Sequence, residues 1–231
     1  MENTRGSHEV NIIQQAIQAI QQYDLRNALA RLQQIPDSHP EHERSLLLSA
    51  QCRHALGEYP ESEATFLSLL RKQPDNAFYR HSLAILYNDW QRPECALPHA
   101  EAATAMAPKS AESWMQLSLA QRSLGDGAGA LKSAEAAMAL SEGNPEALKQ
   151  RGYANLMQHR TDLASRDFVT RMHAVFGPNA PGWRPDFIHT TAAKLRHDIE
   201  QYDYLCAQTA DPALAELADR HRRFLKRLPE D

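Results

Sequence analysis

Residues 111–144 read AESWMQLSLAQRSLGDGAGALKSAEAAMALSEGN, and this stretch decides the fold. Two small residues, Ser118 and Ala130, lie 12 positions apart on either side of the turn signal Gly125-Asp126-Gly127. Both columns recur every 34 residues along the chain, which is typical of a stack of repeated helix pairs. The first column contains Ala16, Ala50, Ala84, Ser118 and Gly152, and the second contains Ala28, Ser62, Ala96, Ala130 and Ala164.

Other features keep the same period. Prolines mark the ends of the first three units at Pro40, Pro74 and Pro108. Each unit is predicted to form two helices of about 12 to 14 residues, joined by a tight turn between the two small columns. Only Ala, Ser or Gly lets two helix backbones approach closely, so the small columns predict where the paired helices cross.

The composition favours an all-α fold. The chain has 231 residues, with 35 alanines against only 11 valines and isoleucines, and sheets are built from β-branched residues. Its formal net charge of -4 argues against a nucleic acid or an anionic membrane as partner. No apolar run approaches the roughly 18 residues that cross a bilayer. Residues 1–8 are polar, lack the order of a secretory signal and are expected to form an N-terminal tail.

No pattern in the sequence predicts catalysis, a metal ion or a cofactor. His39 and His42 lie at the junction between two units, and there is no HExxH motif. The glycine-rich residues 125–129 lack the Lys-Ser/Thr of a phosphate loop. The thiols are widely spaced and predict small buried residues in a reducing compartment, by default the cytoplasm; they are Cys52, Cys95 and Cys206.

The repeat pattern resembles tetratricopeptide repeats (TPR), whose consensus has these small columns and a proline near the unit end. The resemblance implies a right-handed α-solenoid of helix-turn-helix repeats and a non-catalytic role in binding proteins. Three units depart from the consensus at positions that usually hold larger apolar residues. The departures are Gln15 and Ala19 in the first unit, Arg80 in the third, and Arg151 and Asn155 in the fifth. Five units share the register, at 9–42, 43–76, 77–110, 111–144 and 145–178.

The period stops at Asn179, and residues 179–231 are expected to form a linker and a C-terminal pair of amphipathic helices. The connector 179–185 contains Trp183, which is predicted to lie against the last repeat. The helix pair is expected to cap the exposed end of the repeats. Alternatively, one of its helices docks a partner or a second copy of the chain. Its apolar stripes contain Leu195, Ile199, Tyr202 and Leu205, and then Leu214, Leu217, Ala218, Phe224, Leu225 and Leu228.

Two further segments of this region suggest partners. Residues 194–201 resemble a stretch that follows TPR arrays in some bacterial proteins with an iron- and 2-oxoglutarate-dependent oxygenase domain. This similarity implies association with such an enzyme, since the chain lacks the oxygenase's own metal-binding motif. Residues 220–227 carry five positive charges, which predict a solvated helix end, with an acidic protein or nucleic acid as alternatives.

In a TPR solenoid, the first helix of each unit lines the concave surface, so the resemblance implies a binding groove there. No unit carries Lys and Asn at its fifth and ninth positions, which disfavours the known TPR mode of gripping a chaperone carboxylate. The mixture of apolar and charged side chains instead predicts an amphipathic partner segment. The candidate groove residues are Arg44, Gln51, His54, Phe78, His81, Ile85, Asn88, Met115, Leu119, Arg122, Lys149 and Tyr153.

The sequence therefore predicts a cytoplasmic adaptor that binds a peptide or helical segment of another protein in this groove. Three alternatives stay open. The chain's own C-terminal helices fill the groove, the chain serves an enzyme system through those helices, or it assembles with further copies of itself.

Overall fold

The computed structural model describes residues 3–176 and 192–225, and these form twelve α-helices without a β-strand. The predicted all-α class is therefore confirmed. The chain divides into two compact units, Met1–Arg92 and Pro93–Asp231. This division falls inside the predicted third repeat, 77–110. The predicted connector with Trp183 lies outside the described residues.

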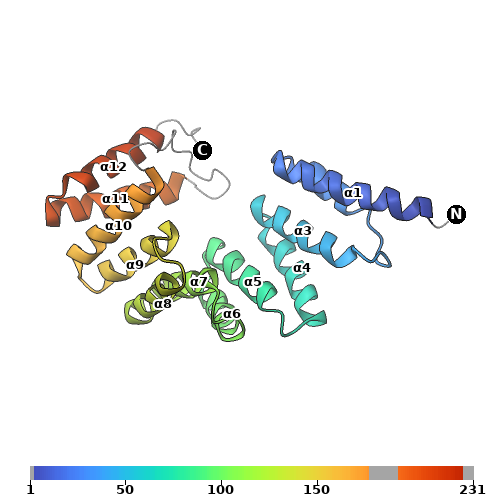
Figure 1. Cartoon of the computed structure of the whole chain (residues 1–231), viewed down its shortest axis with the longest axis horizontal. Coiled ribbons are helices and arrows are strands. Elements are labelled where there is room, and N and C mark those ends of the chain that lie inside the picture. Colours follow the sequence, from blue (N-terminus) through green and yellow to red (C-terminus); the bar gives the residue numbers. More distant parts are fainter. Residues whose placement is uncertain (1–2, 177–191, 226–231) are drawn as a thin grey trace. The chain divides into compact units, whose positions relative to one another are not determined.

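The N-terminal unit is a series of antiparallel helices, each packed on the next (Figure 1). Helix α1 begins at Asn3, so residues 3–8 continue this helix instead of forming the expected tail. Extension of a formed helix adds one hydrogen bond per residue and needs no new nucleus. Helix α2 is shorter than expected, because Pro36 has no N–H to bond the carbonyl of Leu32. The helices are α1 (Asn3–Gln21), α2 (Leu25–Leu32), α3 (His42–Ala55), α4 (Tyr59–Lys72) and α5 (Ala77–Asp89).

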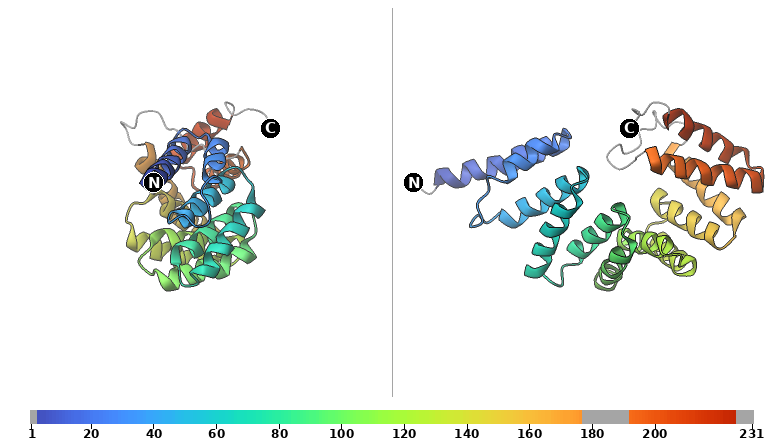
Figure 2. Two further views of the ribbon diagram at one scale, coloured as in Figure 1. Left: turned by 90° about the vertical axis from the view of Figure 1, so that its right-hand side faces the viewer. Right: turned by 180° about the vertical axis from the view of Figure 1, so that it is seen from behind.

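The C-terminal unit continues the pattern of paired helices. Helices α6 to α10 each pack on the next along the chain, and α11 and α12 pack on each other and on α10 (Figure 2). The helices are α6 (Pro93–Met106), α7 (Ala111–Ser123), α8 (Gly127–Leu140), α9 (Pro145–Met157), α10 (Thr161–Phe176), α11 (Ala192–Thr209) and α12 (Pro212–Leu225).

The two columns of small residues are buried, as the sequence predicts. Nine of the ten are 0% exposed, and the tenth, Gly152, is also buried. Contacts between the columns are direct, because the Ser62 hydroxyl donates to the Ala50 carbonyl at 2.8 Å. Ser118 donates to the Ala130 carbonyl at the same distance. The small residues therefore lie where paired helices touch.

The turn inside each repeat contains one residue in the left-handed backbone region. These residues also recur every 34 positions, directly after the first helix of each pair, and end that helix with a local reversal of the chain. Two of them are glycines, for which this conformation carries no steric penalty. The five are Tyr23 (φ 60), Gly57 (φ 76), Gln91 (φ 58), Gly125 (φ 86) and His159 (φ 56).

Three of the departures from the repeat consensus, Gln15, Arg151 and Asn155, have polar partners on the second helix of the same pair. Arg151 donates to Asp167 through Nε at 3.0 Å and through Nη2 at 2.5 Å. Asn155 donates to the same carboxylate at 3.1 Å. Gln15 accepts a hydrogen bond from Arg31. These two residues are 16 positions apart, which is also the spacing between Arg151 and Asp167. A buried polar network therefore replaces the usual apolar contact in the fifth repeat.

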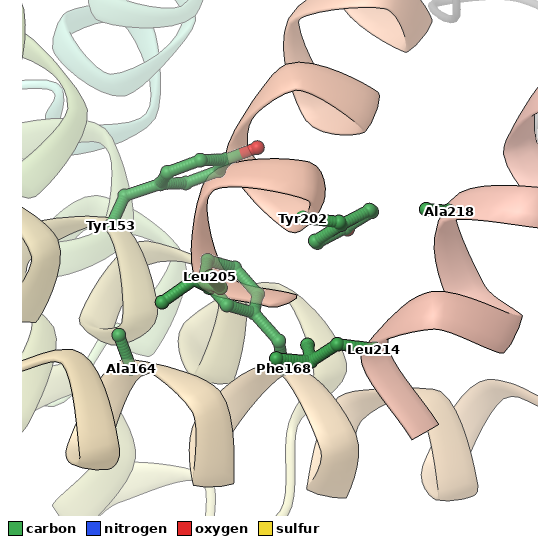
Figure 3. Packing of buried hydrophobic residues seen from close by; sticks show 7 residues of the cluster. All are labelled: Tyr153, Ala164, Phe168, Tyr202, Leu205, Leu214 and Ala218. Atoms are coloured by element: carbon green, nitrogen blue, oxygen red, sulfur yellow. The ribbon is translucent and has the colours of Figure 1, made fainter. Parts of the chain in front are cut away.

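The C-terminal helices cover the end of the fifth repeat. Phe168 of α10 packs edge-on against Tyr153 of α9 and Tyr202 of α11, with ring centroids 5.1 and 5.4 Å away (Figure 3). Leu205 of α11 and Leu214 of α12 are fully buried in the same cluster. A terminal repeat needs such a cover, because its outer face would otherwise expose apolar surface to water.

A leucine in a small column should overpack the helix crossing. We expect Ala130→Leu to lower the free energy of unfolding by about 1 to 3 kcal/mol, measured by chemical denaturation. The matched control is Ala128→Leu on the exposed side of the same helix, α8, which should change it by less than about 0.5 kcal/mol. Equal effects of the two variants would mean that Ala130 is not a contact.

Gly152→Ala should destabilise the fold although alanine is the better helix former. A Cβ there would lie 2.8 to 3.1 Å from three ring atoms of Phe168, which two neighbouring tyrosine rings hold in place. Overpacking costs about 1 to 3 kcal/mol, and the gain in helix propensity is only about 1 kcal/mol.

The double variant isolates the cause. In a Phe168→Leu background the ring is absent, so Gly152→Ala should instead stabilise the protein by up to about 1 kcal/mol. Destabilisation of the same size in both backgrounds would contradict this account.

Candidate functional site

In the N-terminal unit, the predicted groove residues lie on α3 and α5. Phe78, in the first turn of α5, is 48% exposed, although large apolar side chains usually avoid water. Arg44 in the first turn of α3 is also exposed and pairs with Glu41 at 3.2 Å. Gln51 is exposed as well, whereas Ile85 is half-buried. This unit therefore presents an aromatic side chain and a cation at the beginnings of its helices.

Two shallow, adjoining depressions mark this end of α3 and α5. One, of about 430 Å³, is lined by Arg44, Leu47 and Tyr79 among others. The other, of about 560 Å³, is lined by residues 73–78, which include Phe78. The two depressions adjoin, because Gln73 in the lining of one donates to Glu43 in the lining of the other at 2.6 Å. Their polar and apolar lining suits an extended or helical segment better than a small molecule, which usually binds in a deep pocket.

Tyr79 lines the smaller depression and is held in place. Its hydroxyl donates to Glu43 Oε1 at 2.6 Å, and Gln73 Nε2 donates to the same oxygen at 2.6 Å. Burial, followed by the hydrogen bond to Glu43 and the charge of Glu43, raises the pKa of Tyr79 to about 12. The phenol therefore stays protonated and keeps α3, α4 and α5 in a fixed arrangement around the depressions.

The remaining predicted residues of this unit serve the protein's own packing. His54 Nε2 lies 3.0 Å from Asp89 Oδ2, and the His54 ring also lies near the Tyr59 ring, with centroids 6.0 Å apart. His81 and Asn88 are half-buried and also have partners within the chain. They are therefore less available to a partner than Phe78.

In the C-terminal unit, two predicted groove residues belong to the core. Met115 is only 7% exposed and packs against Ala137 and Ala147. Tyr153 is 3% exposed, because Phe168 and helix α11 cover it. The expectation that these side chains line an open groove is wrong. At these two positions the side chains of the first helices pack between helices instead.

The other predicted residues of this unit keep part of their surface. Leu119, Arg122 and Lys149 are half-buried, and Lys149 Nζ lies 4.0 Å from Glu146. The Arg122 guanidinium lies over the Tyr153 ring, 4.7 Å from its centroid. The Tyr153 hydroxyl in turn points towards α11 and donates to Asp198 (Figure 3). Helix α11 thus covers part of the surface that the sequence assigns to the groove.

One charged residue of this surface is missed by the sequence reasoning. Arg171 of α10 lies at the second helix of its pair, so the rule for groove positions passes over it. The sequence nevertheless contains a signal for this residue. Arg171 stands in a column of positions spaced by 34 residues, and the other members of that column are buried and apolar. Those members are Ile35, Leu69, Ala103 and Ala137.

No group of three or more His, Cys, Asp or Glu side chains within 3–176 and 192–225 is placed to hold a metal ion. All three cysteines are free thiols, and burial raises the pKa of the Cys52 thiol to about 11. Such a thiol is a poor nucleophile. None of the helices in the described part of the chain is both long and apolar enough to cross a membrane.

Comparison with known proteins assigns the family. Two models of the tetratricopeptide repeat match the chain, one over residues 19–86 and one over 83–145, and together they span more than half of it. The chain therefore belongs to the tetratricopeptide repeat proteins, as the resemblance implies. This membership supports a protein–protein interaction scaffold, and scaffolds of this family are in general non-catalytic.

Solved structures agree with the fold. MamA (41-end) from Desulfovibrio magneticus RS-1 superposes with a TM-score of 0.65 at 17% identity, covering 74% of this chain and 97% of that one. TTC0263, a thermophilic TPR protein of Thermus thermophilus, superposes with a TM-score of 0.60 at 21% identity, covering 72% and 91%. At such low identity the likeness concerns the fold. No curated protein matches the chain.

Proposed function

We propose that this protein is a non-catalytic adaptor that binds an amphipathic segment of a partner protein on the surface of α3 and α5. The single observation that carries the proposal is the exposure of Phe78 beside two adjoining depressions. An exposed aromatic side chain at the rim of a polar hollow is the usual form of a binding anchor.

The neighbouring charges favour an amphipathic segment over a purely apolar one. Arg44 offers a guanidinium on one side of the depressions, and Glu41 and Glu43 offer carboxylates close to it. An apolar side chain of the partner can pack on Phe78, while flanking charges of the partner fix its direction. The Tyr79 side chain is already held by its hydrogen bond to Glu43, which lowers the entropy cost of ordering this part of the surface on binding.

Phe78→Ala tests the anchor. A peptide selected against the full-length protein from a display library should bind the variant about 10- to 100-fold more weakly, because burial of a phenylalanine contributes about 1.5 to 3 kcal/mol. The dissociation constant is measured by fluorescence anisotropy, with circular dichroism to verify the fold.

The matched control is Leu67→Ala, which removes an apolar side chain that is 36% exposed on α4, the second helix of a pair. It should leave the affinity unchanged. Equal losses in the two variants, or none in Phe78→Ala, would argue against the proposed surface.

The second candidate is an accessory role in an enzyme system through the C-terminal helices. Tyr204 on α11 favours it, since it is 49% exposed next to a helix pair whose other face is already buried. Deletion of these helices would be a poor test, because it would uncover Phe168 and Tyr153.

Tyr204→Ser is the sharper experiment. If α11 docks an enzyme, enzyme capture by the tagged full-length protein should fall at least tenfold, while Phe78→Ala captures it normally. Quantitative mass spectrometry of the captured proteins measures both. If enzyme capture falls in Phe78→Ala but not in Tyr204→Ser, docking through this face of α11 is ruled out.

A further inference from the structure

The two depressions beside Phe78 are lined by more negative than positive charge. Arg44 is the cation of the lining, and it pairs with Glu41 at 3.2 Å, so its charge is already matched within the surface. Two carboxylates of the lining are left once this pair is set aside. The charged residues of the two linings are Glu41, Glu43, Arg44 and Asp75.

Neither remaining carboxylate is neutralised by a cation of the described residues. Glu43 Oε1 accepts from the Tyr79 hydroxyl and from Gln73 Nε2, each at 2.6 Å, but both of these donors are uncharged. Asp75 is exposed and forms no ion pair within the described part of the chain. The nearby cations Arg71 and Lys72 lie at the end of α4 and line neither depression.

The unpaired carboxylates lie beside aromatic rings. Asp75 lines the same depression as Phe78, and Glu43 lines the same depression as Tyr79. The two rings contact each other edge-on, with centroids 6.2 Å apart. A lysine or arginine suits such a surface, because its aliphatic stem packs on an exposed ring while its charged end reaches a carboxylate.

Other kinds of segment fit this surface less well. An acidic or phosphorylated segment would be repelled by Glu43 and Asp75. The N–H groups at the start of α5 would not attract it either, because the Asn76 side chain already accepts from the N–H groups of Phe78 and Tyr79. A purely apolar segment would remove the two carboxylates from water without supplying a partner charge, which is unfavourable.

We propose that the partner segment bound at Phe78 is basic, with a lysine or arginine that pairs with Asp75 or Glu43 next to the apolar side chain that packs on Phe78. This inference deepens the proposed adaptor function and rests on it for the place of binding. The surface would thus select segments that combine apolar and basic residues over neutral or acidic ones.

An unbiased selection tests the composition of the segment. Peptides from a random display library are selected against the full-length protein, and those that also bind Phe78→Ala are removed. We expect the remaining peptides to be enriched in Lys and Arg, and depleted in Asp and Glu, relative to the unselected library. Replacement of the basic residue by Gln in one such peptide should weaken binding about two- to fivefold, measured by fluorescence anisotropy.

Protein variants identify the carboxylates that the peptide contacts. Asp75→Asn removes one charge, and Glu43→Gln removes the other but keeps an oxygen that can accept from Tyr79. Together the two should remove the preference for the basic peptide over its Gln version. The matched control is Glu61→Gln, which removes an exposed carboxylate of α4 and should leave this preference unchanged. Circular dichroism verifies the fold of each variant.

The outcomes separate this inference from the proposal on which it rests. The inference alone is overturned if the Phe78-dependent peptides are not enriched in Lys and Arg, or if Glu61→Gln lowers the preference as much as the other variants. The absence of any Phe78-dependent peptide would overturn the adaptor surface and this inference with it.

A second copy of the chain is the competing occupant, because residues 220–227 carry five positive charges. Sedimentation velocity of the full-length protein distinguishes the two. We expect no self-association that depends on Asp75. Self-association that Asp75→Asn abolishes would assign the surface to a second copy and would overturn its assignment to a partner protein.

Discussion

The close approach of paired helices at the small columns is the constraint on which the rest of the structure depends. At these positions the side chains are reduced to Ala, Ser or Gly, and Ser62 and Ser118 donate directly to a carbonyl of the partner helix. A larger side chain would separate the backbones and shift every contact beside the crossing. Because each pair contacts mainly its neighbours, such a shift affects the next pair as well.

The binding surfaces follow from this packing. Because the helix pairs are held together at their crossings, the residues at the helix ends and on the outer faces can vary without disturbing the packing. In the N-terminal unit this freedom places Phe78 in the lining of one depression, and Arg44 and Tyr79 in the lining of the depression that adjoins it. In the C-terminal unit it places Arg122 and Arg171 beside two tyrosine rings. The same scaffold therefore presents an exposed aromatic side chain in one unit and half-buried arginines beside tyrosine rings in the other.

The fold could be predicted from the sequence because small residues recur every 34 positions. This spacing is recognisable even where single positions depart from the consensus. The site could be predicted only in part. The rule for groove positions finds Phe78 and Arg122, but it also selects Met115 and Tyr153, which the structure buries. Tyr153 is covered by α11, and no repeat pattern encodes where a helix beyond the array packs. Arg171 is missed because the rule considers only first helices, although its column is otherwise apolar.

The contacts of Asp167 with Arg151 and Asn155 have a consequence for how the chain assembles. Repeats of similar shape can pair with the wrong neighbour during folding, since apolar faces accept one another with little discrimination. A buried carboxylate that finds both its partners only on α9 makes such mispairing costly. These contacts therefore favour the pairing of α9 with α10 over the pairing of either helix with a helix of another repeat.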